Sequence, residues 1–134
     1  MEKLDDLKQS ARRALASLNV LVGRPDADDI VEDAAIQRFE YTIEVMWKTT
    51  QRLLFEQGTV VASPKPTIRH AHTHGILSED DAERALKLID LRNLTTHTYK
   101  EELARSIYPM LPEISALFER WLTGIESFQG EPSP

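Results

Sequence analysis

The side chains best suited to chemistry are concentrated in one short segment, residues 92–99, which reads RNLTTHTY. It combines a permanent cation at Arg92, an amide at Asn93, an imidazole at His97 and a phenol at Tyr99. An imidazole titrates near neutral pH and can act as a base or as an acid. A guanidinium offers a planar fork of N–H donors that suits phosphate oxygens. These residue types suit metal-free chemistry on a phosphodiester, with Arg92, Asn93 and His97 as the candidate catalytic residues.

The spacing within this segment limits how its side chains can meet. Arg92 and His97 are five positions apart, which places them about 140° apart around a helix axis. They reach one ligand only if the helix unwinds near Thr95 or if a second copy of the chain completes the site. Thr95 and Thr96, like Asn93, offer neutral hydrogen bonds that could orient a phosphate.

A purely structural interpretation of the same segment stays open. A histidine at a helix end often donates to the free carbonyls of the last turn. Arg92 could simply pair with Asp90, Glu101 or Glu102. Charged clusters of this kind usually form solvated surface and contribute little to stability.

The elements that must position this segment are predicted to be helices, because apolar residues recur at spacings of three and four. The expected helical regions are about 4–22, 28–57, 64–74, 78 into the segment, and 100–128. Pro109 and Pro112 interrupt the last region, so a kink or break is expected there. The predicted fold class is all-α, an antiparallel up-and-down bundle of four to five helices. We expect a single domain over 1–128 and a disordered tail over 129–134.

Composition excludes several classes of protein. The chain has 134 residues, 41% hydrophobic and 28% charged, which suits one globular core. Cysteine is absent, so disulfides, thiolate nucleophiles and cysteine-based zinc sites are excluded. No run approaches the roughly 20 apolar residues of a membrane span, so a cytoplasmic protein with no membrane partner is expected. The net charge of −6 argues against a general nucleic-acid binder, so any RNA must be recognised locally or with the help of a basic partner.

A second cluster carries several cationic or titratable groups over a short predicted helix. It contains Lys65, Arg69, His70, His72 and His74. This cluster could face RNA or contact an acidic partner, and we take Lys65 and Arg69 as candidate substrate-orienting residues. His70 and His74 are one turn apart and could share a metal. No carboxylate follows in the pattern of a metal motif, so we expect no metal and no cofactor.

Two carboxylates, Glu40 and Glu44, lie one turn apart on the predicted helix over 28–57. Paired carboxylates can act as an acid and a base. An ion pair between Glu44 and Lys48 on a solvated face explains them better, because the two residues have the i,i+4 spacing.

Three stretches of the chain together resemble a known family. They are residues 36–41 continuing to Trp47-Lys48-Thr49, then Ser63-Pro64, and then the Arg-x4-His-x-Tyr pattern of segment 92–99. In this order, on an all-helical chain of this length, they are similar to HEPN domains encoded beside minimal nucleotidyltransferases. The same HepT-like group is also named nucleotidyltransferase substrate-binding proteins.

The resemblance implies a helical-bundle homodimer with Arg92 and His97 near the interface. It implies a toxin that cleaves RNA as a metal-independent endoribonuclease and a cognate nucleotidyltransferase that acts as the antitoxin. In some pairs that enzyme places AMP on the tyrosine that corresponds to Tyr99, which would add bulk and negative charge beside His97. One alternative is a non-catalytic subunit that offers substrate to the nucleotidyltransferase. Another is a dimerisation module in which the segment has no remaining activity.

Overall fold

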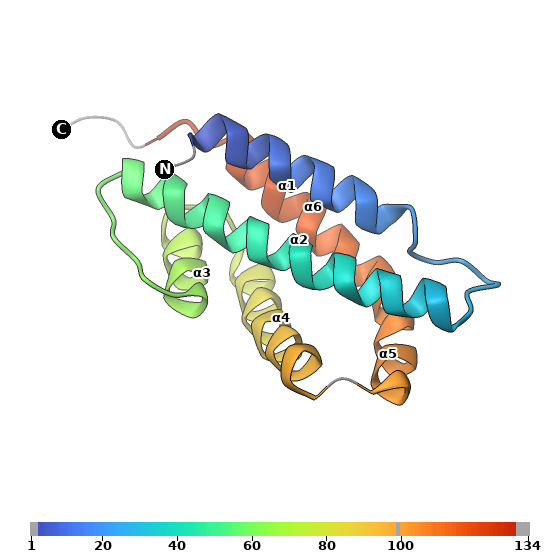
Figure 1. The fold of residues 1–134 in the computed structure, drawn as a ribbon. Helices are drawn as coiled ribbons and strands as arrows, with labels where there is room; N and C mark the ends of the chain where they lie inside the picture. Colours follow the sequence, from blue (N-terminus) through green and yellow to red (C-terminus); the bar gives the residue numbers. More distant parts are fainter. Residues whose placement is uncertain (1–2, 99, 131–134) are drawn as a thin grey trace.

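The computed structural model describes residues 3–98 and 100–130, and over these residues the chain is a bundle of α-helices (Figure 1). The elements are α1 (Leu4–Asn19), α2 (Asp29–Glu56), α3 (Pro64–Thr73), α4 (Glu79–His97), α5 (Glu101–Ile107), the 3₁₀ turn η1 (Tyr108–Met110) and α6 (Leu111–Glu126). No strand occurs in the described ranges, so the predicted all-α bundle is confirmed. Tyr99 and the last four positions of the predicted tail lie outside the described residues.

Local hydrogen bonds set the N-terminal ends of the two helices that carry the candidate site. Asp28 precedes α2, and its carboxylate accepts from the Val31 N–H at 3.0 Å. Ser78 precedes α4, and its hydroxyl accepts from the Asp81 N–H at 3.1 Å. Such caps satisfy N–H groups that have no partner within the helix. The predicted starts of both helices are therefore confirmed.

The last helical region is divided into α5 and α6, as the two prolines predict. Pro109 lies in η1 and Pro112 lies in the first turn of α6, where a missing N–H removes no helix hydrogen bond. Tyr108 is buried at the break, and its hydroxyl donates to the Leu21 carbonyl and accepts from the Arg24 N–H at 3.1 Å. The break is thus attached to the loop after α1. It raises the number of α-helices over the described residues to six, above the four to five expected.

The central element is α2, which contacts each of the other α-helices. Figure 1 shows α1 and α6 running along α2, with α3, α4 and α5 extending from the other side. The rings of Phe39 and Phe118 stack between α2 and α6 with centroids 6.2 Å apart. Trp121 of α6 is fully buried, and its indole N–H donates to the Thr50 hydroxyl at 2.9 Å. None of the helices in the described part is long and apolar enough to cross a membrane.

A buried carboxylate fixes the first turn of α4 against α6. Asp81 accepts two hydrogen bonds from Arg120, at 2.8 and 2.9 Å, and lies 3.5 Å from the Arg84 guanidinium. The Arg120 hydrogen bonds hold the pKa of Asp81 below its usual value, although burial acts in the opposite direction. The ionised form of Asp81 therefore stabilises the contact between α4 and α6.

We expect Asp81→Asn to lower the free energy of unfolding at neutral pH by about 1–3 kcal/mol, because charge-assisted hydrogen bonds to Arg120 are lost. A lowered folded-state pKa contributes stability above the unfolded pKa of about 3.9 and loses it as the pH falls through the folded pKa. The difference from wild type should therefore disappear in strong acid. Urea unfolding of both proteins, from neutral pH down to strong acid, measures this difference in the free energy of unfolding. Asp80→Asn, at the exposed neighbouring position in the same first turn, is the control. It should lower the free energy of unfolding by less than Asp81→Asn does.

Gly124 allows α6 to approach the segment before α4. A Cβ atom at this position would lie 2.1 Å from the Ile76 carbonyl oxygen. Backbone cannot move aside as a flexible side chain can, so we expect Gly124→Ala to cost about 1–3 kcal/mol of unfolding free energy. The higher helix propensity of alanine, about 1 kcal/mol, offsets only part of this. Thermal or urea unfolding measures the change, with the exposed Thr123→Ala as control. An unchanged stability for Gly124→Ala would show that the approach is not close.

Candidate active site

The segment predicted to carry the chemistry forms the C-terminal turns of α4. The helix continues unbroken to His97, and the Thr98 N–H still donates to the Leu94 carbonyl at 2.9 Å. The backbone therefore does not unwind at Thr95, which was one of the two ways for Arg92 and His97 to reach a single ligand. Tyr99 follows directly and lies outside the described residues.

Arg92 is held from α2. Its Nη2 atom lies 3.1 Å from Glu44 Oε2, and its Nη1 donates to Asn93 Oδ1 at 3.2 Å. The arginine side chain is 31% exposed. Among the described residues, the acidic partner of Arg92 is therefore Glu44 of α2. It is not Asp90, Glu101 or Glu102, the neighbouring acids considered from the sequence. The guanidinium is oriented by these contacts while part of it remains accessible to a ligand.

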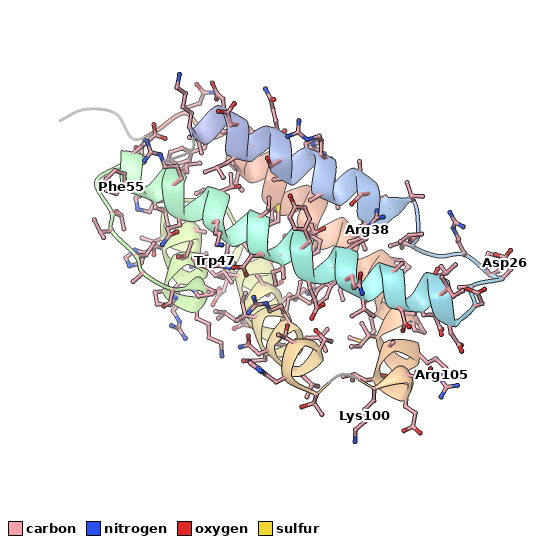
Figure 2. The ribbon with its side chains drawn as sticks, viewed as in Figure 1. Asp26, Arg38, Trp47, Phe55, Lys100 and Arg105 are labelled. Atoms are coloured by element: carbon pink, nitrogen blue, oxygen red, sulfur yellow. The ribbon has the colours of Figure 1, made fainter. Side chains whose placement is uncertain are left out.

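Glu44 is surrounded by donors from its own helix as well as by Arg92. Trp47, shown beside the crossing of α2 and α4 in Figure 2, donates its indole N–H to Glu44 Oε2 at 3.0 Å. Lys48 Nζ lies 3.2 Å from Glu44 Oε1, so the predicted ion pair is confirmed. Burial raises the pKa of Glu44, but the hydrogen bonds from Trp47 and Lys48 and the charge of Arg92 outweigh this and lower it. Arg92 is therefore paired with an ionised carboxylate.

Glu40, one turn earlier on α2, contacts two hydroxyls of α4. Thr95 Oγ1 lies 2.8 Å and Thr96 Oγ1 lies 2.9 Å from the same Glu40 oxygen, Oε2. Thr95 is buried, and its hydroxyl is also 3.0 Å from the Arg92 carbonyl oxygen. Both hydroxyls were predicted to orient a substrate. In the structure both hydroxyls are instead hydrogen-bonded to Glu40. Thr96 is exposed.

His97 is the last residue of α4 and is exposed. The C-terminal end of α4 lies at the margin of the bundle (Figure 1). Asn93 is also exposed, so both side chains can reach a bound molecule or a second chain. Lys100, just before α5, and Arg105, within α5, are further exposed cations and project outward in Figure 2. The sequence interpretation did not include these two residues among its candidates.

The second cationic cluster lies on α3 and the turn after it. Lys65 Nζ lies 2.7 Å from Asp90 Oδ1, so this lysine joins α3 to α4 two residues before Arg92. His74, by contrast, is half-buried, with Nε2 3.4 Å from Thr59 Oγ1. The exposed members are Arg69, His70 and His72. Over the residues that the structure describes, no three metal-binding side chains gather into a candidate metal site.

Glu40 and Glu44 are the residues whose place at this site the sequence interpretation missed. It assigned them to a solvated face, but both are half-buried and contact α4. The available signal was their position at the edge of the apolar stripe that includes Ile43 and Trp47. Residues at such an edge often contact the neighbouring helix as well as solvent.

Known proteins similar to this chain include a curated relative and two solved structures. The probable ribonuclease HepT of Haemophilus influenzae is 30% identical over 94 residues, which cover 63% of this chain and only 62% of that protein. A Thermus thermophilus protein of known crystal structure is 46% identical with a TM-score of 0.80, over 86% of this chain and 98% of the other. The tri-AMPylated HEPN toxin of Shewanella oneidensis, in complex with MNT antitoxin, has a TM-score of 0.76 at 14% identity, over 95% of this chain and 99% of the toxin.

The family match covers almost the whole helical bundle. Residues 6–127 match the family described as nucleotidyltransferase substrate binding protein like. The likeness to the Shewanella oneidensis toxin shows that the fold is that of HEPN toxins. The resemblance inferred from the Arg-x4-His-x-Tyr segment and its two companion stretches is thereby confirmed. The chain therefore belongs to the nucleotidyltransferase substrate binding protein like family.

Proposed function

We propose that this chain is the toxin of a toxin–antitoxin pair, a cytoplasmic, metal-independent endoribonuclease that works as a homodimer. The observation that carries the proposal is the unbroken course of α4 to His97. Arg92 and His97 project about 140° apart from a regular helix, so a single chain directs them at different places. In a homodimer, the end of the partner subunit's α4 would supply a second guanidinium and a second imidazole, so that groups from both chains meet at one RNA phosphate.

Each group has a definite part in the proposed reaction. His97 of one protomer takes the proton from the ribose 2′-hydroxyl, which attacks the adjacent phosphorus. The partner subunit's His97 gives a proton to the 5′-oxygen that leaves, so the products are a 2′,3′-cyclic phosphate and a free 5′-hydroxyl. Arg92 stabilises the charge on the non-bridging oxygens of the phosphorane, and Asn93 adds a neutral hydrogen bond.

The proposed antitoxin is a minimal nucleotidyltransferase that transfers AMP to Tyr99. The Shewanella oneidensis toxin, which is AMPylated and in complex with MNT antitoxin, supports this form of control. Tyr99 is two positions after His97. A phosphate there would add negative charge and bulk where the RNA phosphate must bind, and would repel it.

A second function is a non-catalytic subunit that presents substrate to the nucleotidyltransferase. The net charge of −6 favours it, because an acidic chain attracts RNA weakly. In this case Arg92 and His97 would bind a nucleotide, and the chain alone would not cleave RNA.

The purified chain, shown by intact mass to carry no AMP, should cleave total cellular RNA in the presence of EDTA and leave cyclic-phosphate ends. His97→Ala and Arg92→Ala should each lower the rate by about 100-fold or more, because a general acid–base group or a phosphate-binding cation is lost. His72→Ala, an exposed histidine on α3, is the matched control and should keep the wild-type rate. Wild-type rates in both site variants would refute the assignment. Nucleotide binding by wild type without any RNA turnover would favour the second function.

Incubation with the cognate nucleotidyltransferase and ATP should add one or more AMP groups to wild type and suppress RNA cleavage. Tyr99→Phe should remain unmodified and active, because the accepting phenol oxygen is absent. Intact-mass spectrometry and the RNA assay measure the two effects. Tyr41→Phe removes an exposed tyrosine on α2 and should still be modified. Modification of Tyr99→Phe to the wild-type extent would place the AMP on another residue.

A further inference from the structure

We propose that Glu40 is a positioning residue for the ribonuclease reaction: its carboxylate clamps the last turn of α4 to α2 and thereby sets the direction of His97. The inference rests on the proposed ribonuclease function and adds a residue to it. It is carried by the pair of hydrogen bonds from Thr95 and Thr96 to Glu40 Oε2, at 2.8 and 2.9 Å.

The end of α4 needs a support from outside the helix. The last four carbonyl groups of a helix have no N–H partner within it, and helix ends fray. Many helices end on a glycine in the left-handed region, which satisfies these carbonyls. No glycine follows α4, because the next two residues are Thr98 and Tyr99, and the described one, Thr98, has φ −139° and ψ 61°. The described tether is instead a side-chain contact to α2, made by the two residues directly before His97.

Glu40 and Glu44 hold different parts of the segment. Glu44 binds the Arg92 guanidinium. Glu40 binds the hydroxyls of Thr95 and Thr96, which lie nearer to the helix end. Like charges at i,i+4 repel each other by a few tenths of a kcal/mol, so the acidic pair is not favourable in isolation. The donors that α4 brings to each carboxylate offset this repulsion.

This division predicts a specific kinetic signature for the loss of Glu40. A freed helix end lets the His97 imidazole sample unproductive directions, and a misplacement of about 1 Å can lower a rate by about 100-fold. Binding of the RNA phosphate should change little, because Arg92 keeps its own contact with Glu44. The loss should therefore appear in kcat and not in KM.

The experiment compares Glu40→Ala, Glu40→Gln and Thr96→Val with wild type on a defined RNA in EDTA. Glu40→Ala should lower kcat by about 10-fold or more with KM within about twofold, because orientation and not binding is lost. Glu40→Gln should largely restore kcat, since its amide oxygen can still accept from the hydroxyls. Thr96→Val removes one donor at an exposed position and should give an intermediate kcat. Glu56→Ala is the matched control, because Glu56 is an exposed glutamate on α2 that pairs with Arg52.

Amide hydrogen exchange of residues 95–98 is measured on the same proteins and separates this inference from the proposed function. Exchange there should be faster in Glu40→Ala and unchanged in Glu56→Ala, whether or not the chain cleaves RNA. An inactive wild type would overturn the proposed function and, with it, the catalytic part of the inference. Faster exchange in Glu40→Ala than in wild type would still show that Glu40 holds the end of α4. If wild type is active, unchanged kcat and unchanged exchange in Glu40→Ala and in Thr96→Val would overturn the clamp. A rise in KM alone would assign Glu40 to RNA binding instead and would also overturn it.

Discussion

The contact between α2 and the last turns of α4 is the interaction on which the candidate site depends. Two carboxylates of α2 make it, with Glu44 on Arg92 and Glu40 on the hydroxyls of Thr95 and Thr96. Because α2 also contacts every other α-helix of the described bundle, packing in the core determines the position of α2. The two carboxylates of the site therefore lie on a helix whose position the hydrophobic core determines, whereas His97 is the last residue of α4.

The pairing of Arg92 with a carboxylate is compatible with phosphate binding in an acidic protein. A guanidinium has five N–H donors, and the described contacts of Arg92 to Glu44 and Asn93 engage only part of them. The remaining donors can bind a phosphate whose position is then defined by the orientation that Glu44 imposes. Other cations are also paired with acids, as in Arg120 with Asp81 and Lys65 with Asp90. If RNA is the substrate, as we propose, its attraction is therefore local to the site and does not come from a broad basic surface.

The parts of the fold that could be predicted are those encoded by neighbouring residues. Asp28, Ser78 and Pro109 mark two helix starts and the break between α5 and α6, because capping and the missing proline N–H act within one turn. The partner of Arg92 could not be predicted in this way. Periodicity shows which face of a helix is apolar, but it does not show which helix lies beside the edge of that face. The choice of Glu44 is made by the tertiary packing of α2 against α4.

The two halves of the candidate site are held with different firmness, and this bears on how such a site can be controlled. Arg92 is fixed by an ionised carboxylate on the central helix, and Glu44 in turn accepts from Trp47. His97 is the last residue of its helix, and its side chain is exposed. A bulky charged group added just after His97 would therefore act on the His97 end of the site and not on Arg92, which is paired with Glu44. Control at Tyr99 could block phosphate binding and redirect the imidazole without disturbing the core that positions Arg92.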